Sequence, residues 1–301
     1  MVCRAILKYV LECCLSGTAH SEIKAGYVQY ASYYARTIGY PIRQPIAESS
    51  CAPAFPRERT MKNLLLGQLG QDDFSRLEPY LKSTHFTQHS VLFEAEREIN
   101  HVYFPTTAVV SLVVTLESGD MVEAAMVGSD GVVGASAALD GRISLSLGIV
   151  QLGGDIVVCS IDGLRSVASQ SPKLLSLLIR HEQTVYAQAQ QSAACFASHH
   201  VQARLCRWLL RARDLAGTDT LPFTQEYLAE MLGVRRTSVT VVAHTLQSAG
   251  LIKYARGKIQ IRDVEALQDG ACECYGSVKR HYARLLGNLP SKARLPSKGR
   301  T

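Results

Sequence analysis

The chain has 301 residues, of which 47% are hydrophobic and 19% are charged, with a net charge of +6. This balance is typical of a soluble globular protein with about two domains. The nine cysteines are odd in number and do not suggest a disulfide framework, and no convincing secretory segment is present. These features argue against a disulfide-stapled secreted protein and predict a cytoplasmic location with reduced thiols.

Residues 1–60 show no sustained helical or alternating period of apolar residues, and prolines at positions 41, 45, 53 and 56 interrupt them. We predict either a disordered extension or a chain whose natural start is Met61. Cysteines at positions 3, 13, 14 and 51 could in principle ligate an iron–sulfur cluster. Their spacing contains no Cys-x-x-Cys pair, so we expect none.

Residues 61–169 read as a sensor domain made of short strands. A helical element is expected over 64–81, and alternation of apolar and polar residues begins at His85. Polar turns at 117–120 and 128–131 separate brief β-prone runs, a pattern that predicts a small β-roll with a candidate ligand pocket at its mouth. The runs are 91–93, 102–104, 109–116, 121–127, 145–152 and 156–159.

Residues 170–199 predict one long helix, opened by Ser171-Pro172 and ended at a hinge near His199. Apolar and small side chains recur every three or four residues for about seven turns. This stripe could pack on its own roll, but its unbroken length favours pairing with a second copy of the helix. The predicted dimer residues are Leu174, Leu178, His181, Val185, Ser192 and Phe196.

Residues 200–285 predict a helix over 204–215 followed by a helix-turn-helix and a β-hairpin. Thr224 is placed to cap the first short helix, and Gly233 supplies the left-handed turn after it. A second helix from about Arg235 buries Val239, Val242 and Leu246 and points a polar face outward. Strands over 251–254 and 258–261 form a wing.

The charge distribution indicates DNA as the partner of this module. Residues 201–301 hold 17 Lys+Arg against 8 Asp+Glu, a net of +9, whereas residues 1–200 hold 15 against 18, a net of −3. Arg235 and Arg236 stand at the amino end of the second helix, where the helix dipole alone would favour acids. A helical hairpin inside an enzyme core would not need these cations. Residues 286–301 form a basic tail that reads as a solvated surface.

With roll, long helix and winged helix-turn-helix in this order, residues 61–285 resemble the cyclic-AMP receptor and fumarate-nitrate regulator (Crp-Fnr) family. The resemblance is strongest at 127–134 and 233–240, and it implies an α+β fold with a cyclic-nucleotide-binding-like roll. It also implies that Arg236 reads guanine in the major groove. The DNA-binding residues expected are Arg235, Arg236, Thr237, Ser238, Thr240, Val241, His244, Thr224, Gln225, Lys253, Arg256 and Lys258.

The resemblance also allows the ligand pocket to be examined. Cyclic-nucleotide pockets of the family use a Gly-Glu-Leu turn and an Arg-Ser or Arg-Thr pair, but this chain lacks the glutamate and has no such pair nearby. Gly134, Ser136 and Arg142 are the candidate pocket residues, and Arg142 is the only cation near them. Control by a cyclic nucleotide is therefore the alternative, and the sensor ligand stays open.

We expect a homodimeric, sequence-specific transcription regulator that reads an inverted repeat, with double-stranded DNA, a second copy of itself and RNA polymerase as candidate partners, and no membrane. No enzyme activity, cofactor or metal is expected: Cys272-Glu273-Cys274 has no companion pair, and His85, His89 and His101 lack ligand spacing. A protein-interaction role without DNA binding is a further alternative.

Overall fold

The computed structural model describes residues 62–287 of the chain. The predicted extension over residues 1–60, its four cysteines and most of the basic tail lie outside the described residues. Within residues 62–287, no helix is both long and apolar enough to cross a membrane.

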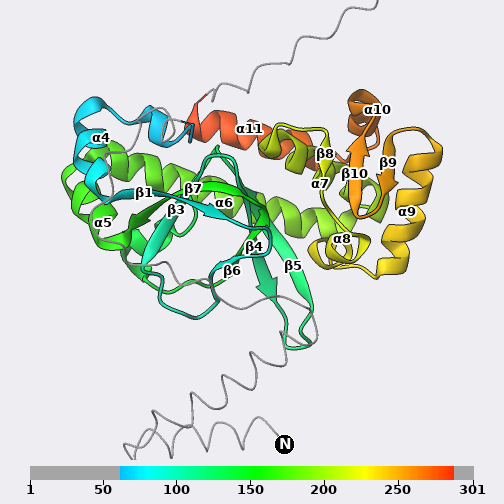
Figure 1. Cartoon of the computed structure of the whole chain (residues 1–301), viewed down its shortest axis with the longest axis horizontal. Coiled ribbons are helices and arrows are strands. Elements are labelled where there is room, and N and C mark those ends of the chain that lie inside the picture. The colour runs from blue at the N-terminus through cyan, green and yellow to red at the C-terminus, as the bar shows by residue number, and fades with distance from the viewer. Residues whose placement is uncertain (1–61, 288–301) are drawn as a thin grey trace, which may run out of the picture. The chain divides into compact units, whose positions relative to one another are not determined.

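The first half of the described chain is an antiparallel β-roll. A 3-10 turn η1 (Leu66–Gln68), helix α4 (Gln71–Leu77) and turn η2 (Glu78–Tyr80) lead into it. One sheet has the strand order β1-β7-β3 and the other β2-β6-β4-β5, and the two form the body of the roll in Figure 1. The strands are β1 (Leu81–Phe86), β2 (Val91–Phe93), β3 (His101–Pro105), β4 (Val109–Thr115), β5 (Met121–Val127), β6 (Leu147–Leu152) and β7 (Gly154–Ser160), with a π-turn η3 (Ala137–Gly141) before β6.

The predicted runs are strands β2 to β7, so this part of the prediction is confirmed. The expected helix over 64–81 is wrong in its extent: α4 ends at Leu77, and β1 begins at Leu81. Pro79 lies between them in the 3-10 turn η2, and proline has no backbone N–H with which to continue the α-helix. Strand β1 then pairs with β7 from Leu81 to Phe86.

Two helices follow the roll. Ser160 and Ser171 cap α5 (Ile161–Gln170) and α6 (Pro172–Ser198) by accepting hydrogen bonds from backbone N–H groups of the first turns. Proline opens α6, as predicted, and His199 ends it in extended backbone. The long helix is thus confirmed to within a residue or two of its predicted bounds.

The carboxyl-terminal half is a winged helix-turn-helix with one helix before it and two after it. It consists of α7 (Val201–Ala216), β8 (Thr220–Leu221), α8 (Gln225–Leu232), α9 (Arg236–Ser248), β9 (Ile252–Ala255), β10 (Lys258–Ile261), α10 (Val264–Asp269) and α11 (Cys274–Leu286). The small sheet has the order β8-β10-β9, with β8 as a strand that the sequence did not predict. Helix α11 returns along α6 and contributes Val278, Tyr282 and Leu286 to the core of the roll side.

The roll and the helix-turn-helix share a hydrophobic core. Met126 and Ile149 of the roll belong to the same buried cluster as Trp208 and Phe223 of the carboxyl-terminal half. A buried ion pair crosses the same boundary, since Arg211 Nη2 lies 2.8 Å from Asp130 Oδ2. The helix-turn-helix is therefore packed onto the roll in this structure.

Candidate nucleic-acid interface

The helix-turn-helix forms because its capping and turn residues are the ones that its backbone requires. Thr224 Oγ1 accepts a 3.1 Å hydrogen bond from Tyr227 N at the start of α8. Gly233, with φ of 59°, adopts the left-handed conformation that ends α8. Arg235 then stands at the N-cap of α9, and the predicted turn between the two helices is confirmed.

Helix α9 buries one face and presents the other to solvent. Val239 and Leu246 are buried as predicted, together with Ala243, whereas Val242 is half-buried. The outward side chains are two guanidinium groups, several hydroxyl groups, one imidazole and one aliphatic group. Those exposed are Arg235, Arg236, Thr237, Thr240, Val241 and His244, and Ser238 is half-buried.

Contacts between the two helices orient the polar face of α9. Thr240 Oγ1 donates a 2.7 Å hydrogen bond to Gln225 Oε1, and Arg236 Nη1 lies 3.5 Å from Glu226 Oε2. Both members of this ion pair are largely exposed, at 64% and 68%, so the pair holds the guanidinium only weakly. Arg236 is therefore free to exchange Glu226 for an anionic or hydrogen-bonding partner outside the chain.

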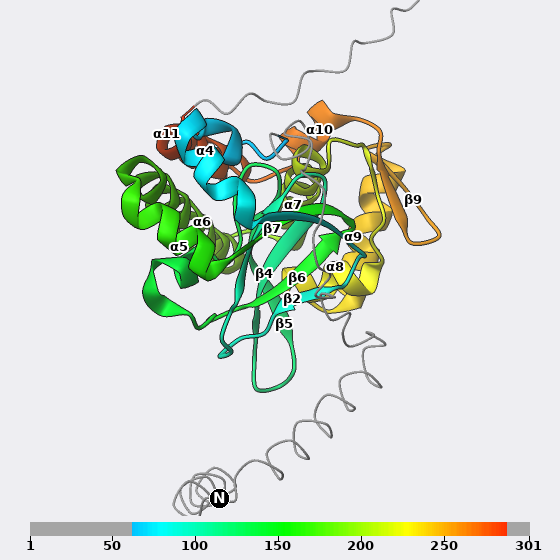
Figure 2. The ribbon, with the colours of Figure 1, turned by 60° about the vertical axis from the view of Figure 1, so that its left-hand side comes forward.

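The wing adds cations beside α9. Its two strands are joined by Arg256 and Gly257, both with positive φ, as a two-residue hairpin turn requires. Lys253, Arg256 and Lys258 are exposed. Tyr254 ties the wing to the first helix, because its hydroxyl accepts a 3.2 Å hydrogen bond from Gln225 N. Figure 2 shows this hairpin projecting beside α9, away from the roll.

The electrostatics of α9 suit an anionic partner. Its first turn contains no acidic residue, and its amino end carries the partial positive charge of the helix dipole in addition to Arg235 and Arg236. Carboxylates would normally stabilise such an end. Their absence, with exposed cations in their place, favours binding of phosphate or of base acceptors by this end.

The candidate ligand residues of the roll lie on one short segment that includes the turn η3. Gly134 has φ of 86° and Ser136 is exposed at the start of η3. Arg142 Nη2 is 2.7 Å from Asp162 Oδ1, so its charge is already paired at the surface. Inside the roll, the ring of Phe93 packs directly over Gly148, within 2.6 Å of where a Cβ would stand.

The predicted dimer face of α6 needs correction. Leu174, Leu178, His181 and Ser192 are at most 4% exposed because the same chain covers them. His181 Nε2, for example, accepts a 3.2 Å hydrogen bond from Val132 N of the roll. Val185 and Phe196 are half-buried, and the guanidinium of Arg204 stacks 4.5 Å from the Phe196 ring centre.

A helical period identifies which residues share a face but not what covers that face. In this structure the roll and α11 cover it, so Leu174, Leu178, His181 and Ser192 are not available to a second copy, whereas Val185 and Phe196 stay partly exposed. The exposed side of α6 instead carries Leu175, Ile179 and Tyr186, at 36%, 50% and 65% exposure.

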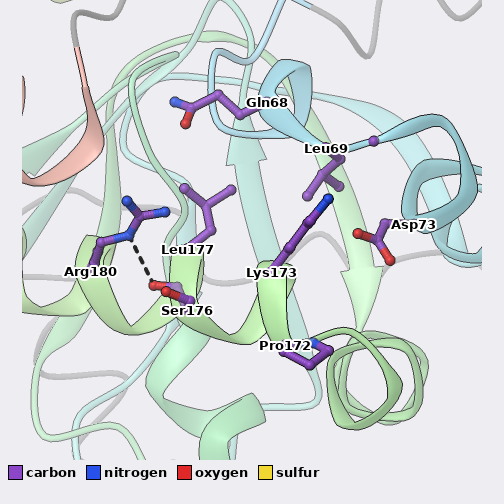
Figure 3. A pocket seen from close by; sticks show the side chains of 9 residues that line it. Gln68, Leu69, Asp73, Pro172, Lys173, Ser176, Leu177 and Arg180 are labelled. Atoms are coloured by element: carbon purple, nitrogen blue, oxygen red, sulfur yellow. Dashed lines mark hydrogen bonds between the residues drawn. The ribbon is translucent and has the colours of Figure 1, made fainter.

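A surface pocket of about 380 Å³ lies at the start of α6 (Figure 3). Lys173 and Arg180 project from α6 toward it, and Asp73 faces them from α4. Arg180 Nε donates back to Ser176 O at 3.3 Å.

The structure also joins residues that the sequence kept apart. Cys195 and His199 at the end of α6 meet Cys272 and Cys274 at the start of α11, with their ligand atoms all within 4.8 Å of one another. The prediction of no metal, which rests on Cys272 and Cys274 having no companion pair in the sequence, does not take this convergence into account. The signal that was missed is the pair Cys195-x-x-x-His199, whose i, i+4 spacing puts both side chains on one face of a helix.

Comparisons with known proteins match this architecture. A family model described as a Crp-like helix-turn-helix domain matches residues 203–269. No significant match is found among curated proteins. The matches to similar solved structures cover nearly the whole length of each of those structures but only about two thirds of this chain. At 14% to 23% identity, this likeness identifies the fold.

Three of these structures illustrate the similarity. A Crp/Fnr-family transcriptional regulator from Thermus thermophilus shares 23% sequence identity with this chain, with a TM-score of 0.53. The match covers 63% of this chain and 98% of that chain. FixK2 from Bradyrhizobium japonicum shares 14%, with a TM-score of 0.56 and coverage of 64% and 98%. The c-di-GMP-responsive global regulator CLP of Xanthomonas campestris shares 14%, with a TM-score of 0.55 and coverage of 64% and 100%.

Proposed function

We propose that this chain, whose residues 203–269 match a Crp-like helix-turn-helix domain and whose fold is that of Crp/Fnr regulators, is a DNA-binding transcription regulator of the Crp-Fnr family. We further propose that it reads an inverted-repeat DNA site as a homodimer. The observation that carries the proposal is the outward face of α9. This face is exposed, free of acids in its first turn and flanked by three wing cations.

The proposed reading mode places α9 in the major groove, which is about 12 Å wide and admits one helix with its side chains. Arg236 is the candidate reader of guanine, because its planar fork can donate to both O6 and N7. Val241, 67% exposed, is suited to contact with a thymine methyl group. Thr224, Lys253 and Lys258 would contact phosphate and set the register of the helix.

We place the dimer contact on the exposed side of α6. Leu175, Ile179 and Tyr186 are spaced so that they fall on one stripe of the helix. A groove of about 410 Å³ runs beside this stripe, between α6 and α11, with Tyr186 and Leu285 among its lining residues. Two such stripes meeting across a twofold axis would present two α9 helices to successive major grooves, about 34 Å apart.

Cyclic-nucleotide control gains no support from the roll. Arg142 is paired with Asp162, and Phe93 and Tyr103 belong to the packed core within the roll. A cyclic phosphate buried there without an arginine would lack charge-assisted hydrogen bonds worth about 1.5–3 kcal/mol each. We therefore propose regulation by an effector other than a cyclic nucleotide, or by none.

Footprinting of genomic fragments with the purified full chain tests the proposal. We expect protection of an inverted repeat whose half-site centres are about one helical turn apart. Arg236→Ala should weaken binding to that site by about 1–3 kcal/mol and leave binding to random DNA much less affected. Lys258→Ala should weaken binding to all sequences alike and lower the salt dependence.

Equal losses on specific and random DNA for Arg236→Ala would refute its role as a base reader. Failure to prefer any genomic fragment over scrambled DNA at moderate salt would refute sequence-specific binding altogether.

A further inference from the structure

Four potential metal ligands converge where α6 ends and α11 begins. They are Cys195, His199, Cys272 and Cys274, and one ligand atom from each lies within 4.8 Å of all the others. We infer that these side chains bind a single zinc ion through three sulfurs and one imidazole nitrogen. None of the four belongs to the proposed DNA-reading surface, so this inference does not depend on the proposed function.

Two of the distances between these ligand atoms are close to those of a tetrahedral zinc site. With Zn–S bonds of about 2.3 Å and Zn–N bonds of about 2.0–2.1 Å, two sulfurs of a tetrahedral site stand about 3.8 Å apart and a sulfur and nitrogen about 3.6 Å apart. Cys195 Sγ and Cys272 Sγ are separated by 3.5 Å, and Cys274 Sγ and His199 Nδ1 by 3.6 Å. An ion would need only small adjustments of these side chains.

Local backbone structure explains how the ligands are presented. Cys195 occupies the last turn of α6, and His199 is its C-cap, with His199 N donating to Cys195 O at 3.0 Å. Cys274 opens α11, and Cys272 accepts through its carbonyl from Tyr275 N. Each helix end thus contributes two ligands from adjoining backbone. The three cysteines are buried, at 8% exposure or less.

The surrounding groups are those that support a metal-bound histidine and thiolate. With His199 Nδ1 facing the sulfurs, its Nε2 lies 3.2 Å from Glu273 Oε1. A carboxylate on the second ring nitrogen fixes the orientation of a ligating imidazole and strengthens it as a ligand. Gln191 Nε2 also donates a 3.1 Å hydrogen bond to Cys274 Sγ, as a thiolate would require.

The charge of such a site is balanced from within the protein. Three thiolates and one Zn²⁺ leave a net charge of −1, which is costly to bury without a cation nearby. Arg204 and Arg207, each 7% exposed, both interact electrostatically with Cys195. The Nε atoms of both arginines lack a hydrogen-bond partner among the described residues. An anionic metal centre would compensate these buried charges.

A single zinc ion fits these four side chains better than an iron–sulfur cluster or a disulfide does. An iron–sulfur cluster is itself several bonds wide, so it holds its cysteine sulfurs further apart than these lie. A disulfide between Cys195 and Cys272 would use only two of the four groups and would leave the Glu273, His199 and Cys274 arrangement without a role. Three sulfurs with one imidazole are a common structural zinc set.

The ion would connect the long helix to the last helix of the DNA-binding half. Helix α11 already packs along α6, where Tyr282 Oη donates a 3.1 Å hydrogen bond to Gln188 Oε1. The ligands lie at the other end of this contact, beside the break between α6 and α7. A zinc ion there would fix the helix-turn-helix relative to α6, and its removal would loosen that connection.

Metal analysis of the full chain, purified under reducing conditions without chelators or a metal-affinity tag, tests the inference. We expect about one zinc per chain, and replacement by Co²⁺ should give the absorption bands of a tetrahedral thiolate site. Cys272→Ser and Cys274→Ser should abolish the Co²⁺ bands. Glu273→Gln should weaken zinc affinity by roughly 10- to 100-fold while leaving the stoichiometry at saturation unchanged.

Cys159→Ala and Cys206→Ala are the matched controls, because both remove a buried cysteine outside the group and should keep the metal. The inference is overturned if the folded, reduced wild-type chain contains no zinc and gives no Co²⁺ bands. It is also overturned if the metal content survives in the Cys272→Ser, Cys274→Ser double variant, since the ion would then lie elsewhere among the nine cysteines. These measurements need no DNA, so they fail or succeed separately from the footprinting.

Discussion

At the scale of single residues, Gly233 shows how one position can satisfy two requirements. Its φ of 59° is costly for any residue with a Cβ, and a Cβ there would stand 2.9 Å from Val122 Cγ2 of the roll. The turn of the helix-turn-helix is therefore also a contact between the two halves of the chain. The sequence indicates the first requirement, but only the tertiary structure reveals the second.

Gly233→Ala should consequently destabilise the protein more than Gly250→Ala. Gly250 also has a positive φ, of 78°, but a Cβ there meets nothing within 4 Å. Both variants should lose about 1–2 kcal/mol from backbone strain, and Gly233→Ala about 1–3 kcal/mol more from overpacking. Chemical denaturation measures the difference, which should shrink in a Val122→Ala background. Equal losses for both glycines in the wild-type background would show that Val122 does not matter.

Glu123 is a buried acid between the roll and α7. Ser111 Oγ lies 2.5 Å from Glu123 Oε2 and 2.6 Å from Gln151 Oε1. Burial raises the pKa of Glu123 to about 7, although Ser111 and the nearby Arg207 and Arg211 lower it in part. A protonated Glu123 would donate to Ser111, which could then donate to Gln151.

This raised pKa predicts a pH dependence of stability. Because the pKa is higher in the folded chain than in the unfolded one, folding takes up a proton between about pH 4.5 and pH 7. The free energy of unfolding should therefore fall as pH rises through this window, by about 3 kcal/mol, and stay low above it. Glu123→Gln, which resembles the protonated acid, should remove this fall.

Denaturation at pH 5 and pH 8 checks the expectation, with Glu117→Gln in the exposed β4–β5 turn as the control. If Glu123→Gln and Glu117→Gln retain the same pH dependence as the wild type, Glu123 is not its source.

At the scale of elements, α6 has two faces with different roles. The buried face, with Leu174, Leu178 and His181, packs on the roll and α11, whereas Ile179 and Tyr186 face solvent. The sequence predicts the length of the helix and the period of its buried stripe correctly. It cannot assign a partner to either face, because side chains from α11, about a hundred residues further on, cover part of the helix.

Ile179→Glu and Tyr186→Glu should therefore disrupt the proposed dimer without unfolding the chain. Each substitution removes apolar contact from both copies and adds like charges across the axis, which should raise the dimer dissociation constant by about 100-fold or more. Sedimentation over a concentration series measures this change. Lys173→Glu adds an acid about 140° round the same helix from the centre of the stripe and should leave the dimer intact. Unchanged sedimentation of both stripe variants would place the contact elsewhere.

At the scale of the whole molecule, the helix-turn-helix is docked on the roll while the face of α9 proposed to read DNA stays exposed. Trp208, the only tryptophan of the chain, lies at this boundary and is 1% exposed. Its ring packs edge-to-face on Phe223, with ring centres 4.9 Å apart. Because α9 and the wing already face away from the roll (Figure 1), DNA can be bound without breaking this core.

Trp208 fluorescence can test whether the docked arrangement persists. We expect its emission to stay blue-shifted and protected from iodide quenching when the specific site is added, with the denatured chain as the exposed reference. A red shift with increased quenching on DNA binding would instead show that the DNA-binding half separates from the roll.

The sequence by itself determined the order of elements, the caps and turns of the helix-turn-helix, the wing and the polar face of α9. These follow from signals a few residues apart, such as Thr224 before α8 and the Arg256-Gly257 turn, and local backbone energetics fix them. Contacts between distant segments set which face of α6 is covered, bury Glu123 beneath α7, and bring Cys195 and His199 to Cys272 and Cys274. Burial and the convergence of ligands depend on contacts between segments that are distant in the chain. The local period of a helix does not indicate which distant segment packs against it.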